Sequence, residues 1–167
     1  RLALFDCLTC DKCVPVCPND ANFAYALPRG EVPVVKLRRE GGSWTRRIEG
    51  SLRFDKKHQL ANFADFCNEC GNCDVFCPED GGPYVVKPRF FGTRGSWERA
   101  KDQDGFALER EGGKVTVHGR FSGREYGLII SGDEAGYTGP GFCVRYSPAD
   151  PAGTLRGTAE GEVDLTY

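Results

Sequence analysis

Two runs of cysteine constrain this chain more than any other feature of its sequence. The first run is Cys7, Cys10, Cys13 and Cys17, and the second is Cys67, Cys70, Cys73 and Cys77. Each run reads C-x2-C-x2-C-x3-C-P and ends in Pro18 or Pro78, and each position of the second lies 60 residues after its counterpart (67 − 7 = 60). Four cysteines and a proline that repeat at one offset indicate an internal duplication.

The spacing inside each run is typical of ligands to a [4Fe–4S] cluster. Such a cluster presents four iron corners, each of which takes one thiolate, and a loop with Cys at every third position can wrap three of them. Where two such runs occur, the last Cys of each run binds the other cluster. We therefore expect two sets of ligands that cross between the runs: Cys7, Cys10, Cys13 and Cys77 for cluster I, and Cys67, Cys70, Cys73 and Cys17 for cluster II.

Zinc is the main alternative for so many cysteines. Zinc sites use four ligands in two C-x2-C pairs that are usually a dozen or more residues apart, and they need neither a third closely spaced Cys nor the trailing proline. A full set of disulfides is disfavoured because nine Cys is an odd number and no secretory signal is visible. The sequence therefore favours iron–sulfur clusters in the reducing cytoplasm, with Cys143 left as a buried free thiol on a strand.

For residues 1–88 the duplication predicts an α+β, ferredoxin-like two-[4Fe–4S] domain. We expect residues 2–5 to pair with 84–87 and residues 22–27 to pair with 60–64, with a short helical turn after the last Cys of each run. Inside the loops, Gly71 can adopt a positive φ, and its counterpart Asp11 is one of the few other residue types that tolerate it. The aromatic side chains expected to cover the clusters are Phe23, Tyr25, Phe63 and Phe76.

The rest of the chain reads as β structure. Residues 29–57 form an insert that we expect to be a β-hairpin turning at Gly41-Gly42, with nine basic and four acidic residues and so a charge of +5. It either docks an acidic partner or is simply a solvated charged hairpin. Residues 89–167 predict a small β-rich C-terminal domain, with strands at 114–118, 126–130, 142–146 and 162–167 and a loop at 92–112.

Charge near the second run predicts an order of reduction. Glu69 and Asp74 lie within that run, whereas the first run contains Asp11 and Lys12. An added electron is harder to accept beside acids, so we expect cluster II to have the lower potential.

A wider resemblance extends beyond the cysteines. It rests on residues 13–19 (CVPVCPN), residues 61–73 (ANFADFCNECGNC), Phe76-Cys77-Pro78 and Gly82-Pro83-Tyr84. These segments resemble the C-terminal iron–sulfur region of flavoproteins of the YgfK type, a family named for selenate reduction and related to the glutamate synthase small subunit. The resemblance implies that the chain is the electron-transfer segment of a larger protein, which fits the absence of Met and the start at Arg1.

Several functions are disfavoured by composition. A net charge of −2 makes no case for nucleic acid, and no apolar run approaches the ~20 residues of a membrane span. No G-x-G-x-x-G and no catalytic substrate site is visible, so FAD and NADPH would bind upstream domains. We expect an electron-transfer module of a flavin-dependent, NAD(P)H-linked oxidoreductase with a flavoprotein domain or subunit as partner. A free-standing ferredoxin-type carrier, or a structural cluster domain of an interaction protein, is the alternative.

Overall fold

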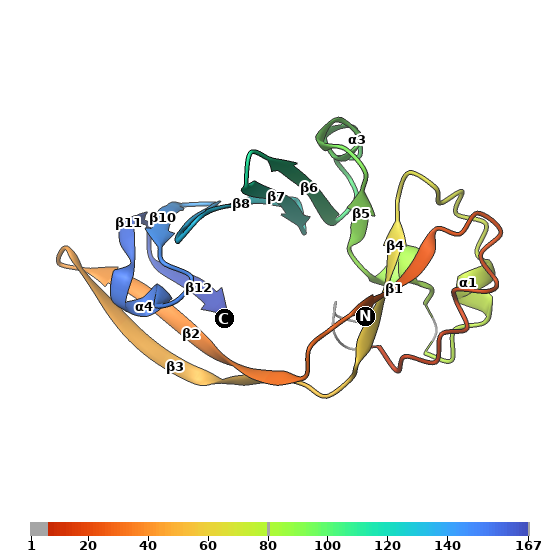
Figure 1. Ribbon diagram of the computed structural model, residues 1–167, viewed down its shortest axis with the longest axis horizontal. Helices are drawn as coiled ribbons and strands as arrows, with labels where there is room; N and C mark the ends of the chain where they lie inside the picture. Colours follow the sequence, from red (N-terminus) through yellow and green to blue (C-terminus); the bar gives the residue numbers. More distant parts are fainter. Residues whose placement is uncertain (1–6, 80, 167) are drawn as a thin grey trace. The chain divides into compact units, whose positions relative to one another are not determined.

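The computed structural model describes residues 7–79 and 81–166 of the chain (Figure 1). In chain order the strands are β1 (Asn22–Ala26), β2 (Gly30–Glu40), β3 (Ser43–Phe54), β4 (His58–Phe63), β5 (Arg89–Phe91), β6 (Gly105–Glu111), β7 (Lys114–Phe121), β8 (Arg124–Ser131), β9 (Glu134–Gly139), β10 (Phe142–Tyr146), β11 (Arg156–Ala159) and β12 (Glu162–Thr166). The helices are single turns or little more: α1 (Asn72–Val75), α2 (Pro83–Val86), α3 (Arg94–Arg99) and α4 (Pro151–Thr154).

The predicted α+β, ferredoxin-like fold class is wrong. The described chain is mostly β, with one sheet of nine strands in the order β1-β4-β5-β6-β7-β8-β9-β10-β11 and a second of three in the order β12-β2-β3. Sequence reasoning treated the strands beside the cysteines as isolated pairs. In the structure β4 also pairs with β5 and β5 with β6, both in parallel, so the cysteine-bearing region continues into a larger sheet.

The chain divides into two compact units. Unit 1 draws its described residues from 7–29, 54–108 and 119–123, and unit 2 draws on 30–53, 109–118 and 124–166. The domains expected from sequence, 1–88 and 89–167, follow the order of the chain, whereas the units do not. The difference arises because the hairpin insert groups with the later strands and because residues 89–108 group with the cysteine runs.

In unit 1, β1 and β4 form an antiparallel pair from Asn22 opposite Asn62 to Ala26 opposite His58, which confirms the expected pairing of residues 22–27 with 60–64. A row of phenylalanines ties the next strands together. The ring centroids of Phe23 and Phe90 are 5.7 Å apart, those of Phe90 and Phe106 5.5 Å, and those of Phe106 and Phe121 5.0 Å. Edge-to-face and tilted pairs at these spacings stabilise the sheet beyond their burial alone.

The second expected strand pair is not found. Residues 2–5 lie outside the described residues, and residues 84–87 do not form a strand, because α2 begins at Pro83. Proline suits the first position of a helix, since its φ is preset and the N–H it lacks would be unpaired there anyway. The helical turns expected after the last Cys are also misplaced, because α1 begins before Cys73 and ends before Cys77.

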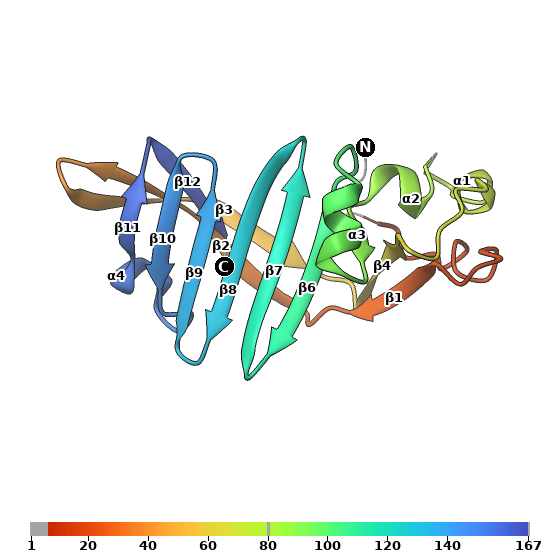
Figure 2. The ribbon, with the colours of Figure 1, turned by 90° about the horizontal axis from the view of Figure 1, so that it is seen from above.

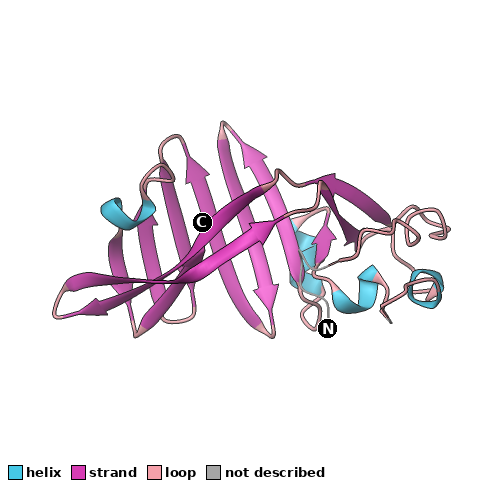
Figure 3. Cartoon of the chain, turned by 90° about the horizontal axis from the view of Figure 1, so that it is seen from below, coloured by secondary structure: helices cyan, strands magenta, loops and turns pink. Residues whose placement is uncertain are grey.

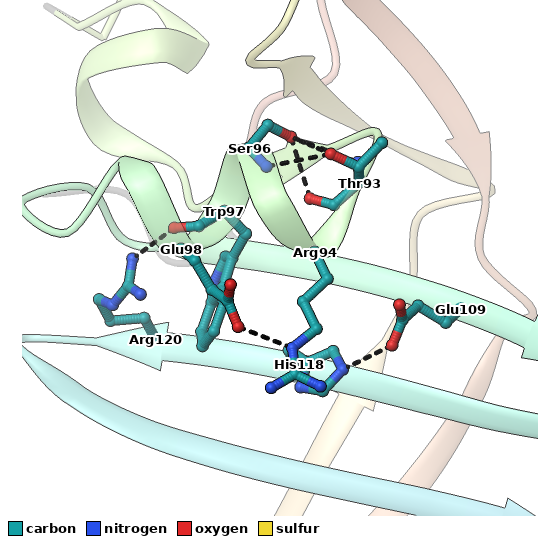
Figure 4. Close-up of polar contacts among 8 residues, drawn as sticks. All are labelled: Thr93, Arg94, Ser96, Trp97, Glu98, Glu109, His118 and Arg120. Carbon is teal, nitrogen blue, oxygen red and sulfur yellow. Dashed lines mark hydrogen bonds and ion pairs between the residues drawn. The ribbon is translucent and has the colours of Figure 1, made fainter.

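Helix α3 is fixed to unit 1 by a cap at its start and an arginine at its end (Figure 4). The Thr93 hydroxyl accepts from the Ser96 N–H at 3.0 Å, and the Ser96 hydroxyl accepts from the Thr93 N–H at 3.3 Å, which together make a capping box. Arg120 donates to the carbonyls of Trp97 (3.1 Å) and Ala100 (2.9 Å), and its guanidinium lies 4.1 Å from the centroid of the Trp97 ring. Sequence reasoning assigned this region, 92–112, to loop.

In unit 2, strands β8 to β11 run side by side and antiparallel (Figure 2). The expected hairpin insert is present as β2 and β3, and β12 pairs with β2, which completes the three-stranded sheet (Figure 3). Val35 and Leu37 of β2 are each 1% exposed and pack against Trp44, Tyr137 and Phe142. The two sheets of this unit therefore share an apolar core.

Some basic residues of the hairpin form ion pairs within unit 2. Lys36 contacts Glu49 at 3.2 Å and Glu162 at 3.4 Å, and Arg47 contacts the same two acids. These ion pairs neutralise part of the positive charge that suggested docking to an acidic partner. They favour the interpretation of a solvated charged hairpin.

Four strands expected in the C-terminal region are present as β7, β8, β10 and β12, each at or near its expected bounds. Sequence reasoning missed β5, β6, β9 and β11. These are short, or carry glycine and charge at positions where a strand pattern is normally apolar, as in Arg156–Ala159.

Candidate metal centre

The two cysteine loops have the same backbone conformation at matching positions. Thr9 and Glu69, which are 60 residues apart, have φ of 56° and 57°. Asp11 and Gly71 have φ of 60° and 83°, which confirms the positive φ expected at both. Left-handed residues that alternate with right-handed ones turn successive N–H groups to one side of a loop, and such concavities bind anions and iron–sulfur centres.

Backbone hydrogen bonds repeat in the same way. Each loop has two of them, at positions 60 residues apart: Val14 N–H to Asp11 O (3.1 Å) with Asp74 N–H to Gly71 O (2.9 Å), and Cys17 N–H to Val14 O (3.2 Å) with Cys77 N–H to Asp74 O (3.0 Å). The duplication is therefore visible in structure as well as in sequence, although the side chains of the two loops differ.

The four thiols expected to hold cluster I line one pocket of unit 1. This pocket has about 320 Å³ of space between atoms, part of it open to solvent, and its lining is Cys7, Cys10, Cys13, Cys77, Leu60, Gly81, Pro83, Val86 and Lys87. Cys77 comes from the second run and the other three from the first. The walls between the thiols are mostly apolar.

The other four thiols line a second pocket of the same unit. Its space is about 240 Å³, and its lining is Cys17, Cys67, Cys70, Cys73, Asn22, Asn62, Asn68, Glu69, Gly71 and Tyr84. Here Cys17 of the first run joins three cysteines of the second. Unlike the first pocket, this one has three asparagines and a glutamate among its lining residues.

Burial separates the cysteines within each run. Cys13 and Cys73, which are equivalent by the offset of 60, are 6% and 7% exposed, whereas Cys10 and Cys70 are exposed. Burial raises the pKa of the Cys13 thiol to about 12, with Cys7, Cys73 and Cys10 adding to the effect, and burial also raises the pKa of Cys73. A thiolate at either position therefore needs a positive charge beside it, which a bound metal supplies.

The residues present fit an iron–sulfur cluster in each pocket. All nine described cysteines are free thiols, and thiolates are the ligands that iron–sulfur clusters take. Thiol sulfurs already take part in backbone hydrogen bonds: Thr9 N–H donates to Cys7 Sγ (3.3 Å), Ala21 N–H donates to Cys17 Sγ (3.2 Å), and the Cys73 thiol bonds the backbone of Tyr84. Hydrogen bonds to sulfur of this kind are one means by which a protein sets cluster potential. Among the described residues, no three Cys, His, Asp or Glu side chains converge on a point where a single ion could sit.

A pair of buried amides supports both loops, and sequence reasoning did not find it. Asn22 donates to the Cys13 carbonyl at 2.9 Å and accepts from Asn62 Nδ2 at 2.9 Å, and the two side chains are 3% and 0% exposed. Asn22 also hydrogen-bonds the Cys73 thiol, which lowers the pKa of that group against the larger effect of burial. Only the register of β1 on β4 brings the two amides together.

None of the four aromatic residues expected to cover the clusters is among the residues that line the two pockets. Phe23 and Tyr25 pack against Phe90, Phe63 packs against Phe66 at 5.0 Å, and Phe76 is 54% exposed. Instead, Leu60, Pro83 and Val86 line the first pocket, and Tyr84 lines the second. Cys143, expected to be buried, is exposed on β10.

Comparison with known proteins supports iron–sulfur clusters in this part of the chain. Residues 3–80 match the model of the 4Fe–4S dicluster domain family. The match covers a little under half of the chain, and it supports two [4Fe–4S] clusters as the cofactors of this region.

The chain is also similar to "Putative oxidoreductase YgfK" of Escherichia coli strain K12 and to the protein of the same name in Escherichia coli O157:H7. Each is 32% identical to it over 100 residues, which is 60% of this chain and 7% of the relative. The chain therefore spans a small part of the length of these relatives, and the resemblance noted from the sequence is confirmed. Together the comparisons indicate iron–sulfur electron transfer.

No solved structure matches the chain. In the part of the chain that the structure describes, no helix is long and apolar enough to cross a membrane.

Proposed function

We propose that this chain carries single electrons as the electron-transfer segment of a larger flavin-dependent, NAD(P)H-linked oxidoreductase. In this proposal Cys7, Cys10, Cys13 and Cys77 hold cluster I, and Cys67, Cys70, Cys73 and Cys17 hold cluster II. The observation that carries it is the pocket lining, in which each set of three closely spaced thiols is joined by the last Cys of the other run.

Each bound cluster supplies a site that takes up or releases one electron at a time, so two clusters can divide the two electrons of a reduced flavin. The chain's own residues supply the rest. The crossed thiols fix the two sites within one unit, and Leu60, Pro83 and Val86 limit the access of water to the first. The N–H groups of Thr9 and Ala21 bond ligand sulfur and so favour added negative charge there.

The wider setting is supported by the relatives. A chain that matches 7% of a protein named as an oxidoreductase is expected to work with the remaining parts of such a protein. We place FAD and NADPH on those other domains or subunits, with a flavoprotein as the electron donor or acceptor. Eight thiolate ligands also suit a reducing compartment, and we place the protein in the cytoplasm.

The test is to purify the full chain without oxygen and to measure iron, sulfide and EPR spectra before and after reduction. We expect about eight iron atoms per chain, as two [4Fe–4S] clusters require, and two reducible signals. In Cys77→Ser we expect the signal of the first-run site to change although Cys77 belongs to the second run. Cys143→Ser is the matched control, because Cys143 is an exposed free thiol on β10 outside both runs.

Two outcomes would count against the proposal. A change confined to the second-run site in Cys77→Ser would overturn the crossed ligand sets. Failure of dithionite to reduce either site reversibly in the wild-type chain, with its full iron content retained, would argue against electron transfer and leave a structural cluster domain as the better interpretation.

A further inference from the structure

Lys87 is a buried cation beside the first thiol pocket. It directly follows α2, where its N–H donates to the Pro83 carbonyl at 3.1 Å, and it is 3% exposed. Its side chain lines the pocket shared by Cys7, Cys10, Cys13 and Cys77. Lysine is rarely buried to this extent unless a nearby group compensates its charge. The burial of Lys87 therefore needs an explanation.

The second thiol pocket has a different set of charges. Its lining contains Glu69, which forms an ion pair with Arg89 at 2.9 Å, together with the uncharged amides of Asn22, Asn62 and Asn68. Among the described residues, this lining contains no lysine or arginine. The lining of one pocket thus contains a cation and that of the other an anion, although the cysteines themselves are related by duplication. A charge in a partly buried site acts on its neighbours more strongly than a screened surface charge does.

Lys87 also lines a polar pocket on its other side. That pocket, with about 540 Å³ of space between atoms and open to solvent, is lined by Tyr84, Val85, Lys87, Arg89, Asp102, Gln103 and Asp104. Its two carboxylates and its opening to water lower the cost of burying a charged group there. Lys87 is therefore shared between the lining of this pocket and that of the first thiol pocket.

We propose that Lys87 sets the order in which the two sites are reduced, by raising the potential of the site held by Cys7, Cys10, Cys13 and Cys77. The step is the uptake of one electron from a reductant, in the cell a reduced flavin. No bond forms or breaks, and Lys87 keeps its proton. The buried ammonium stabilises the added negative charge at this site more than at the other. This inference rests on the ligand sets proposed above.

The experiment is an anaerobic redox titration of the full chain followed by EPR, with dithionite as the reductant and the signals assigned by Cys77→Ser and Cys17→Ser. Lys87→Met keeps the length of the side chain and removes its charge. We expect the equilibrium constant for electron uptake at the first site to fall at least tenfold, which is about 59 mV for one electron, with a smaller change at the second. Lys87→Arg, which keeps the charge, should restore most of the difference.

Lys101→Met is the matched control, because Lys101 is an exposed lysine of the same unit, and we expect it to change neither potential. Equal shifts at both sites, or no shift in a Lys87→Met protein with its full iron content, would overturn the role of Lys87. If Lys87→Met does not retain its iron, Lys87→Gln, which leaves a polar group for the polar pocket, makes the same measurement. Assignment of the signals by Cys77→Ser and Cys17→Ser tests the ligand sets separately, so the two failures can be told apart.

Discussion

The two cysteine runs have the same backbone but different surroundings. Both loops take left-handed conformations at the same two positions and form the same backbone bonds. Around the first, the side chains of Lys56 and Asn22 bond the carbonyls of Cys7 and Cys13, and His58 contacts Asp11 at 2.8 Å. Around the second, Arg89 contacts Glu69 at 2.9 Å, and Asp74 accepts from the Gly82 N–H at 2.9 Å.

The difference shows which features the duplication keeps and which it does not. Ligand spacing and loop conformation are kept because a cubane accepts only a narrow arrangement of thiolates. The charges outside the loops are not part of that arrangement, so they differ, and they can give two like sites different potentials. The predictions below test how far the likeness extends and what the difference does.

The largest effect should come from the two buried ligands. Cys13→Ser and Cys73→Ser replace thiols that are 6% and 7% exposed and are packed with Leu60 in one apolar cluster. If the runs are equivalent, both variants should lose iron to a similar extent, and unit 1 should unfold more readily because its core is built around the thiols. Iron content and thermal unfolding followed by visible absorption measure the effect.

The control for this pair is Cys143→Ser, which should keep its iron and its unfolding temperature. Loss of iron in one of the two buried variants, with full retention in the other, would show that the runs are not equivalent as ligands. The exposed pair, Cys10→Ser and Cys70→Ser, should disturb packing less, because neither thiol belongs to the buried cluster.

Much of this site was predictable from the sequence, for a definite reason. Ligand spacing is a local property of the chain, and the preference of Asp11 and Gly71 for positive φ is a property of the residue type. The pairing of β1 with β4 followed from the symmetry of the duplication and from two short apolar segments. Each of these signals lies within a few residues of a cysteine.

The rest depends on contacts between distant segments. Residues 84–87 read as a strand from Tyr84, Val85 and Val86, but Pro83 starts a helical turn there instead. Strand β5 is three residues long, and its Phe90 contacts Phe23 edge-to-face and Phe106 in a tilted arrangement. No local sequence pattern predicts that so short a strand pairs in parallel with β4 and β6. The nine-stranded sheet therefore could not be predicted from the sequence. Lys87 and the Asn22–Asn62 pair are found only once the loops are in place.

The next effect in size concerns the amide that joins the loops. Asn22→Ala leaves the Cys13 carbonyl and the Asn62 amide without the bonds that Asn22 provides, and both bonds are buried. We expect a loss of about 1–3 kcal/mol in the free energy of unfolding, measured by denaturant with the visible absorption of the clusters as the signal. The matched control is Asn72→Ala, because Asn72 is exposed and bonds Val16 O at 3.4 Å. Equal losses in the two variants would contradict a special role for the buried pair.

A smaller effect is expected from Glu69, the residue at which the sequences of the two cysteine loops differ most clearly in charge. Glu69 stands where the first run has Thr9, so Glu69→Thr makes the two loops alike at that position. Because the Glu69 side chain is 51% exposed, losing its ion pair with Arg89 should cost less than about 1 kcal/mol, and Arg89 keeps two bonds to Tyr84 O. The potential of the second site should rise toward that of the first in an EPR titration.

Glu98→Thr is the control for this swap, since Glu98 is also an exposed acid in an ion pair, with Arg94 on α3 (Figure 4). It should leave both potentials unchanged. A wild-type chain in which the site of Cys67, Cys70 and Cys73 is reduced first would refute the expectation that this site has the lower potential.

The smallest effect is expected from Tyr25, which lies in the segment after the first run. Its counterpart after the second run, by the offset of 60, is Val85 (85 − 25 = 60). The Tyr25 hydroxyl is buried with no hydrogen-bond partner among the described residues, so Tyr25→Phe should change the stability at neutral pH by no more than about 1 kcal/mol. Burial, helped by Cys7, raises the pKa of Tyr25 from 10.0 to about 12. Between these values the unfolded chain releases this proton and the folded chain keeps it, so the wild type should lose stability as the pH rises above 10. Denaturant unfolding at pH 8 and pH 11 should show a smaller loss in Tyr25→Phe than in the wild type or in Tyr126→Phe, and an equal loss in all three would remove Tyr25 as the cause.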